Sequence, residues 1–191
     1  MTTVSTANEA QLIAQAQKGD RNAFSELVRV HAQGVLNVVY HLCGDMLIAE
    51  DAAQETFIRA WQNLPNYRPQ TSLRNWLYRI AFNAGMDMIR KNRRIVPDDI
   101  NEMRLADDQP SLEAAVAERE RAKLVQGAIL SLPDASRAVL VLREYEGLSY
   151  QEISSTLDIP VGTVMSRLNY ARKLLKSKLE QNYLQVEAEY V

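Results

Sequence analysis

Every proline of this chain falls between stretches of helical periodicity, and this placement restricts the fold more than any other feature. Proline lacks a backbone N–H and breaks helix interiors. Between the prolines, apolar residues recur at intervals of three and four, and no segment alternates as a β-strand does. The chain is therefore predicted to be all-α. Its prolines are Pro65, Pro69, Pro97, Pro110, Pro133 and Pro160.

Local signals place the ends of the N-terminal helices. A first helix stops at Gly19, Asp20 can cap the second, and Gly44–Asp45 ends that helix. A third helix then runs to about Asn63, and Ser72 can cap a fourth that reaches about residue 91. These signals predict a helical domain over residues 8–95.

The middle of the chain has the composition of a flexible linker. Residues 96–110 are acidic, nearly free of large apolar side chains and bracketed by prolines. A second small helical domain is predicted over residues 111–180, and Ser149 and Glu152 form a capping box within it. Its last helix runs from Val161 to about Leu179, and the tail 181–191 has no assigned role.

The formal net charge of −2 hides an uneven distribution. Residues 59–94 hold eight Arg or Lys against one acid, and residues 166–178 hold five against none. Residues 96–118, in contrast, carry a net charge of −6. Two basic segments separated by an acidic one fit two surfaces that face a polyanion, or two ordinary solvated helix faces.

Composition argues against several functional classes. With a single cysteine, the chain has no internal disulfide and no thiolate-rich metal cluster. His31, His41 and Cys43 fit core and surface positions better than a metal site. No nucleophile–base pair or phosphate loop indicates an enzyme. The absence of a signal peptide or an apolar span predicts a cytoplasmic protein without direct membrane insertion and without a cofactor.

The segment from residue 148 to residue 178 has the plan of a helix-turn-helix. A short capped helix, a tight turn and a basic second helix would place that second helix in the major groove of DNA. The alternative is a basic surface helix of a bundle. The candidate DNA-binding residues of this helix are Thr163, Ser166, Arg167, Tyr170, Arg172 and Lys173.

The segment between residues 67 and 91 mixes aromatic rings with positive charges. Single-stranded nucleic acid is held by this combination, because bases stack on rings while cations follow the phosphates. Tyr67 and Arg79 are the stronger candidates, whereas Trp76 and Phe82 also have the spacing of core residues. The candidates are Tyr67, Arg68, Trp76, Arg79 and Arg90.

A third surface is predicted on the helix before Asn63. Asp51, Gln54 and Glu55 fall on adjoining faces of this helix, and Phe57 supplies an aromatic ring nearby. Polar groups around an apolar anchor suit a helix–helix docking surface. An ordinary solvated face fits the same spacing.

Three motifs occur in the order that they have in one protein family. LREYEGLSYQEISSTLDIPVGTVMSRLNYARKLLK closely resembles region 4 of the extracytoplasmic-function (ECF) sigma factors, of the sigma-70 family. AEDAAQETFIRAWQNL resembles their region 2.2, and SLRNWLYRIAFNAGMDMIRK resembles regions 2.3 and 2.4. The resemblance covers about residues 9–180.

The resemblance implies a promoter-specificity subunit of RNA polymerase with no reaction of its own. Region 2 would bind the β′ clamp helices and the minus-ten element of promoter DNA, and region 4 the β flap and the minus-thirty-five element. It implies that the loop at residues 66–72 and Asn83 capture an unstacked base, and that an anti-sigma factor binds the chain. Met165 stands where many relatives carry Arg or Lys. The resemblance therefore does not specify which minus-thirty-five sequence this chain recognises.

The main rival is a helix-turn-helix regulator that acts without polymerase. This reading explains residues 148–178 but gives no role to the Asp51–Phe57 face or to the aromatic and basic segment. DNA binding with and without core polymerase separates the two readings.

Overall fold

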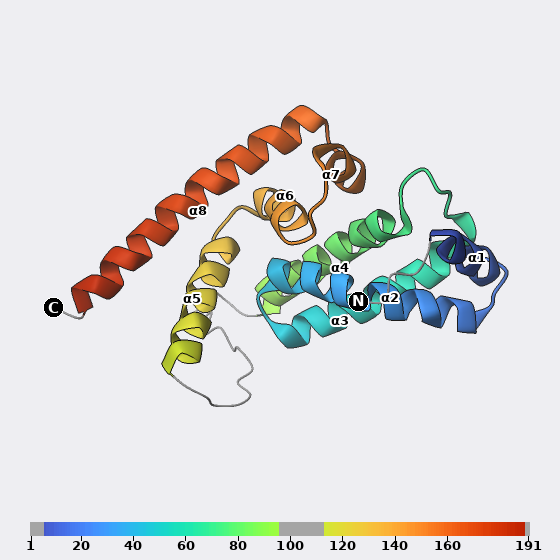
Figure 1. Ribbon diagram of the computed structural model, residues 1–191, viewed down its shortest axis with the longest axis horizontal. Helices are drawn as coiled ribbons and strands as arrows, with labels where there is room; N and C mark the ends of the chain where they lie inside the picture. The colour runs from blue at the N-terminus through green and yellow to red at the C-terminus, as the bar shows by residue number, and fades with distance from the viewer. Residues whose placement is uncertain (1–5, 96–112, 190–191) are drawn as a thin grey trace.

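The computed structural model describes residues 6–95 and 113–189, and all its regular elements are helical (Figure 1). This confirms the all-α prediction. The predicted linker, residues 96–110, lies outside the described residues. The elements are α1 (Thr6–Ala16), α2 (Arg21–Cys43), α3 (Met46–Asn63), the 3-10 helix η1 (Leu64–Asn66), α4 (Leu73–Ile95), α5 (Glu113–Leu130), α6 (Asp134–Glu144), α7 (Tyr150–Leu157) and α8 (Val161–Glu189).

The predicted capping residues end the N-terminal helices. The Asp20 carboxylate accepts hydrogen bonds from the first backbone N–H groups of α2, and Asp45 accepts one from Ile48 at the start of α3. Between them Gly44 has φ +77°, a left-handed conformation that glycine adopts without strain. Gly44 and Asp45 confirm the predicted break between α2 and α3, and Asp20 confirms the predicted start of α2.

The first bundle consists of α1 to α4. Small side chains on α3, among them Ala49, Ala52 and Ala60, are fully buried and let α2 and α4 approach closely. Thr56, also fully buried, satisfies its hydroxyl by donating to the Ala52 carbonyl at 2.7 Å. This packing fixes which side of α3 faces outward.

The second bundle consists of α5 to α8. Ser149 and Glu152 form the predicted capping box at the start of α7. The last helix continues to Glu189, ten residues beyond its predicted end at Leu179. Residues 181–189 contain no proline or glycine, so no local signal stops the helix there.

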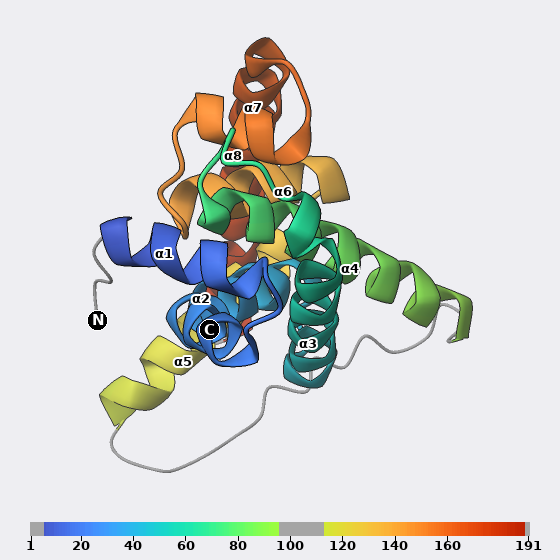
Figure 2. The ribbon, with the colours of Figure 1, turned by 90° about the vertical axis from the view of Figure 1, so that its right-hand side faces the viewer.

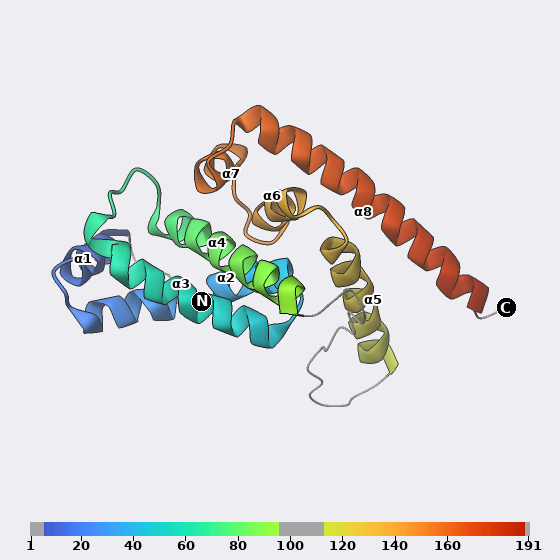
Figure 3. The ribbon, with the colours of Figure 1, turned by 180° about the vertical axis from the view of Figure 1, so that it is seen from behind.

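The two bundles pack against each other (Figures 2 and 3), with α5 and α6 against α2 and α7 against α4. Arg137 of α6, which is 4% exposed, donates to the Leu42 carbonyl of α2 at 2.6 Å. A Cβ atom added at Gly44 would lie 2.3 Å from Leu130 Cδ1, so glycine also permits this close approach. One cluster of buried apolar side chains includes residues of both bundles.

Candidate nucleic-acid and partner-binding surfaces

One outward face of α3 combines polar and apolar side chains. Leu47, Asp51, Gln54 and Ile58 follow each other at intervals of three and four residues, and all four are exposed. Leu47 is 73% exposed and Ile58 is 53% exposed. We call these four residues the α3 stripe. The sequence prediction included the two polar members but missed Leu47 and Ile58, although their spacing from Asp51 and Gln54 would have located them.

Two other residues predicted for this surface, Glu55 and Phe57, are half-buried rather than exposed. Phe57 is half-buried and packs against the core, because the next residue, Ile58, occupies the outward position. Glu55 accepts from Arg59 Nε at 2.6 Å. Phe57 is therefore not an exposed anchor beside Asp51 and Gln54.

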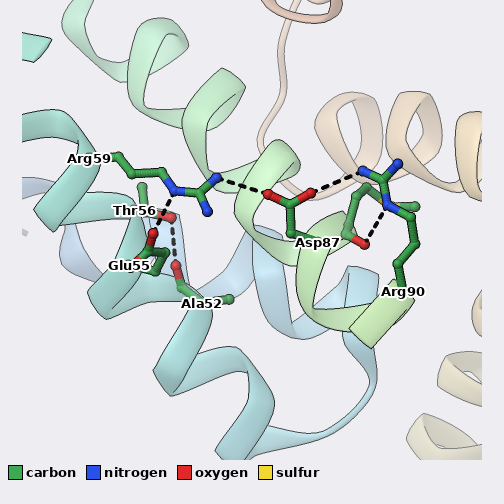
Figure 4. Close-up of polar contacts among 7 residues, drawn as sticks. Ala52, Glu55, Thr56, Arg59, Asp87 and Arg90 are labelled. Carbon is green, nitrogen blue, oxygen red and sulfur yellow. Dashed lines mark hydrogen bonds and ion pairs between the residues drawn. The ribbon is translucent and has the colours of Figure 1, made fainter. Parts of the chain in front are cut away.

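Arg59 links α3 to α4 through a chain of ion pairs (Figure 4). Its guanidinium also donates to Asp87 Oδ2 at 3.0 Å, and Arg90 donates to the other oxygen of the same carboxylate at 3.1 Å. The hydrogen bonds that Arg59 donates to the carboxylates of Glu55 and Asp87 raise the pKa of its guanidinium. Arg90, a predicted DNA contact, is thus partly neutralised by Asp87.

A cavity of about 570 Å³ lies between the loop before α4 and helix α7. Trp76 lines it and is half-buried, with its ring 4.9 Å from that of Tyr67. Tyr67 is 5% exposed and donates its hydroxyl to the Thr71 carbonyl at 2.7 Å, so its main contacts order the loop. Besides Trp76, the lining residues are Asn66, Tyr67, Arg68, Gln70, Thr71, Asn75, Arg79, Ser155 and Thr156.

Two buried polar atoms beside this cavity have no hydrogen-bond partner among the described residues. They are Asn75 Oδ1 on α4 and Thr156 Oγ1 on α7. A buried polar group without a partner costs roughly 1–3 kcal/mol. The contact between α4 and α7 is therefore incompletely satisfied.

The same side of α4 carries the other predicted DNA contacts. Arg79 donates to Asp158 Oδ2 at 3.3 Å, and Asn83 is exposed one turn further along. The buried Tyr78, also on α4, donates its hydroxyl to the Glu146 carboxylate. Burial and this carboxylate together raise the pKa of Tyr78. Arg68, in the loop, is exposed.

The buried residues of α8 show which side of this helix faces outward. Val164, Leu168 and Ala171 are buried against the second bundle. Among the predicted contacts, Thr163 and Arg167 are half-buried at the edge, and Ser166, Tyr170, Arg172 and Lys173 are exposed. Between residues 161 and 173, the other exposed residues of α8 are Val161, Gly162, Met165 and Asn169.

Two features of this α8 face bear on what can approach it. Arg172 donates to Glu144 at 2.6 Å, and this hydrogen bond raises the pKa of the Arg172 guanidinium. Open space surrounds the position of a Cβ atom at Gly162, and Met165 is 54% exposed beside it. Asn169 could have been found from its spacing of four residues before Lys173.

The histidines and the cysteine occupy separate places. His31 pairs with Glu9 at 2.9 Å, and His41 Nδ1 donates to Gln126 at 2.8 Å. Burial lowers the pKa of His41 and raises the pKa of Cys43 to about 12. Within residues 6–95 and 113–189, no group of three His, Cys, Asp or Glu residues is placed to hold a metal ion. None of the described helices is long and apolar enough to cross a membrane.

Two family models match the chain. The model described as Sigma-70 region 2 matches residues 27–95, and the model described as Sigma-70, region 4 matches residues 122–175. The chain is 39% identical over 171 residues to the ECF RNA polymerase sigma factor SigE of Mycolicibacterium smegmatis, covering 86% of this chain and 65% of SigE. It is 36% identical over 179 residues to the ECF RNA polymerase sigma factor SigW of Bacillus subtilis, covering 87% and 94%.

Solved structures share the fold. CnrH in complex with the cytosolic domain of CnrY superposes with a TM-score of 0.69 at 27% identity, covering 91% of this chain and 98% of CnrH. The sigma factor RpoE of Bartonella quintana, solved with the anti-sigma factor NepR, gives a TM-score of 0.66 at 23% identity, covering 82% and 96%. The second likeness shows the fold alone.

Proposed function

The chain belongs to the ECF sigma factors of the sigma-70 family, and we propose that three of its surfaces bind RNA polymerase and promoter DNA. Proteins of this family are non-catalytic specificity subunits that direct promoter-specific transcription initiation, and this is the function of the chain. The observation that carries the assignment of surfaces is the α3 stripe, because its exposed apolar side chains have no partner role within the fold.

The α3 stripe binds the β′ clamp helices of core polymerase. Leu47 and Ile58 lie at its two ends, with the polar Asp51 and Gln54 between them. Burying a Leu or Ile side chain contributes roughly 1.5–3 kcal/mol, so two such anchors supply a large part of a specific helix–helix contact. The polar residues between them set the register of the docked helices.

The cavity beside Trp76 and the adjoining side of α4 bind the unpaired strand of the minus-ten element. Trp76 offers a ring for stacking, worth roughly 1–3 kcal/mol per base. Arg68 and Arg79 lie at the cavity and can follow the phosphates, while Asn83 offers both a donor and an acceptor to a base edge. Trapping one strand in this way favours the open duplex.

The exposed face of α8 reads the minus-thirty-five element in the major groove. Gly162 leaves room for close approach of a backbone, and Lys173 is placed for a phosphate. Met165 presents an apolar surface that matches the C5-methyl group of thymine, whereas Arg or Lys at this position would favour guanine or phosphate. Ser166 and Asn169 supply the polar contacts to bases.

The second bundle also binds the β flap, and an anti-sigma factor binds the chain in competition with polymerase. RpoE of Bartonella quintana, a sigma factor of the same fold, was solved with the anti-sigma factor NepR. We place the activity in the cytoplasm, where core polymerase and promoter DNA are found.

The assignment of the α3 stripe is tested by the affinity of the full chain for purified core polymerase. Ile58→Glu should weaken binding by at least about tenfold, since it removes roughly 1.5–3 kcal/mol of apolar burial and adds a charge. Val30→Glu is the matched control, because Val30 is an exposed apolar residue on α2, outside the stripe. Equal loss in both variants, or no loss in Ile58→Glu, would contradict the assignment.

A further inference from the structure

We infer that Gln17, in the turn after α1, is a positioning residue of the proposed minus-ten site. It holds the segment between α3 and α4, residues 64–72, in the conformation that accepts an unpaired base; this segment is called here the capture loop. The inference rests on the function proposed above for the cavity beside Trp76. Gln17 does not line that cavity, so its effect on DNA must pass through the capture loop.

The side-chain amide of Gln17 bridges two backbone carbonyls of the capture loop. The turn after α1 lies beside this loop (Figure 1), and Gln17 Nε2 donates to the Leu64 carbonyl at 3.0 Å and to the Tyr67 carbonyl at 2.9 Å. A primary amide has two N–H bonds, and both are used here. The two hydrogen bonds join residues 47 and 50 positions apart in the sequence, so they tie the loop to a distant part of the first bundle.

The other hydrogen bonds of Tyr67 are local to the capture loop. Its backbone N–H donates to the Leu64 carbonyl at 3.0 Å, and its hydroxyl donates to the Thr71 carbonyl at 2.7 Å. These bonds set the internal shape of the loop but do not fix where the loop lies relative to α1 and α2. The Gln17 amide supplies that tie at the level of the backbone.

Gln17 projects from a well-fixed turn. Its backbone N–H donates to the Ile13 carbonyl at 2.9 Å, and the N–H of Asp20 donates to the Gln15 carbonyl at 3.2 Å. The preceding residue, Ala16, is 3% exposed. Asp20 in turn caps α2. A side chain held in this way has the rigid support that a positioning residue requires.

The Tyr67 carbonyl has a second donor, and this donor is a proposed DNA contact. Arg68 Nη1 donates to the Tyr67 carbonyl at 3.1 Å and to the Pro65 carbonyl at 3.2 Å. Arg68 is exposed, and to follow a phosphate its guanidinium must leave these carbonyls. Because Tyr67 is 5% exposed, a carbonyl left without any donor there would be costly. Gln17 keeps the Tyr67 carbonyl satisfied while Arg68 exchanges backbone for phosphate.

Tyr67 carries the effect of Gln17 to the cavity. Its ring lies 4.9 Å from the ring of Trp76, on which a base is proposed to stack. A shift of the Tyr67 backbone therefore moves the ring that supports Trp76, together with the cavity wall at Asn66 and Arg68. A displacement of roughly 1 Å in such a supporting group is enough to weaken a binding site.

The test compares Gln17→Met with Gln33→Met in the full chain assembled with core polymerase. Methionine is close to glutamine in length but supplies no donor. Gln33 is the matched control, because it is exposed on α2 and donates at 2.9 Å to Asn37 of the same helix. The probe is a single-stranded DNA pool of random sequence, about 12 nucleotides long. The bound DNA is sequenced, and the enrichment of each base at each position is measured.

Gln17→Met should lower the enrichment of the most strongly preferred base by roughly fivefold or more, the effect expected from the loss of two hydrogen bonds. Gln33→Met should change this enrichment by less than about twofold, since its one hydrogen bond lies outside the capture loop. The affinity for core polymerase should be equal in both variants and the wild type. An equal fall in both variants, or an unchanged enrichment in Gln17→Met, would overturn the inference.

Amide hydrogen exchange of the free chain separates positioning from a general loss of stability. In Gln17→Met, the amides of the capture loop should exchange roughly tenfold faster, while those in the centres of α2 and α3 keep the rates of the wild type. Acceleration throughout the first bundle would assign Gln17 to general stability and contradict the positioning role.

Failure of the inference is distinguishable from failure of the proposed function. A wild-type protein that enriches no base would contradict the proposed role of the cavity, and the inference would fall with it. A wild-type preference that Gln17→Met retains in full would overturn the inference alone.

Discussion

Replacing Arg137 by methionine tests whether the two bundles are energetically coupled. The guanidinium of this buried residue donates to three carbonyls, those of Leu42, Leu130 and Leu132, at 2.6, 2.7 and 3.0 Å. Leu42 is in α2, near the end of a helix where carbonyls lack intrahelical partners. Methionine keeps the apolar stem but supplies no donor. The variant should lose about 3–5 kcal/mol, the usual loss when one partner of a buried charged network is removed.

Urea unfolding measures this loss with two independent probes. Both tryptophans, Trp61 and Trp76, lie in the first bundle, so their fluorescence reports a part of the fold that does not contain Arg137. Far-UV circular dichroism reports all helices. With an m-value of about 2 kcal/mol/M, a loss of about 4 kcal/mol lowers the midpoint by about 2 M urea.

The tryptophan transition decides the question. We expect it to move by at least the equivalent of about 1.5–3 kcal/mol, the contribution of a hydrogen bond from a charged group to the Leu42 carbonyl. Arg143→Met is the control, because Arg143 donates to one carbonyl, that of Leu148, within its own bundle; it should destabilise less. A tryptophan midpoint unchanged by Arg137→Met would refute the coupling.

Three further predictions concern single positions. Replacing thymine by deoxyuridine in the minus-thirty-five element should weaken holoenzyme binding about fourfold, because burial of one methyl group contributes roughly 0.8 kcal/mol. Met165→Ala should abolish this effect of deoxyuridine. An equal effect in the variant and the wild type would contradict the contact between Met165 and thymine. Burial lowers the pKa of His41 below its ordinary 6.5, so the unfolded chain binds the proton more readily than the folded chain. The contribution of His41 to the free energy of unfolding is therefore complete above pH 6.5 and is lost as the pH falls through the lowered pKa. His41→Asn should flatten the dependence of the unfolding free energy on pH, measured by unfolding at successive pH values. Gly44→Ala should cost more than about 1 kcal/mol, since its φ is positive and Leu130 fills the space of a Cβ, whereas Gly127→Ala, with open space around it, should gain roughly 0.5–1 kcal/mol by thermal unfolding.

Local chemistry made the helix boundaries predictable. Asp20, Gly44 and Ser149 act through backbone groups within a few residues of themselves, and each ends or begins a helix as expected. The end of α8 was missed because no local stop signal exists near residue 179, and the helix continues to Glu189.

The outward direction of a side chain is set by packing rather than by spacing alone. Phe57 and Ile58 are neighbours on α3, and both suit an apolar anchor by type. Which of them points outward depends on where α2 and α4 pack, and that contact places Phe57 on the core and Ile58 in solvent. The same reason explains why Tyr67, predicted to be a leading DNA contact in a polar loop, is 5% exposed.

The contact between the bundles left no signal in the sequence. Arg137 and Leu42 are 95 residues apart, and a hydrogen bond to a backbone carbonyl requires no particular side chain at position 42. The ion pair of Arg137 with Asp134 lies within α6 and gives no indication of α2. Likewise, Glu146 and Asp158 are ordinary polar residues of a turn and a helix end until α4 is placed against them.

The most direct test of the account is initiation by the purified chain with core polymerase on fragmented genomic DNA, with the 5′ ends of the transcripts sequenced. The account predicts initiation at a limited set of sites that share a two-part motif, and loss of that initiation in Ile58→Glu but not in Val30→Glu. Transcripts no different from those of core polymerase alone, together with sequence-specific DNA binding by the free chain, would contradict it.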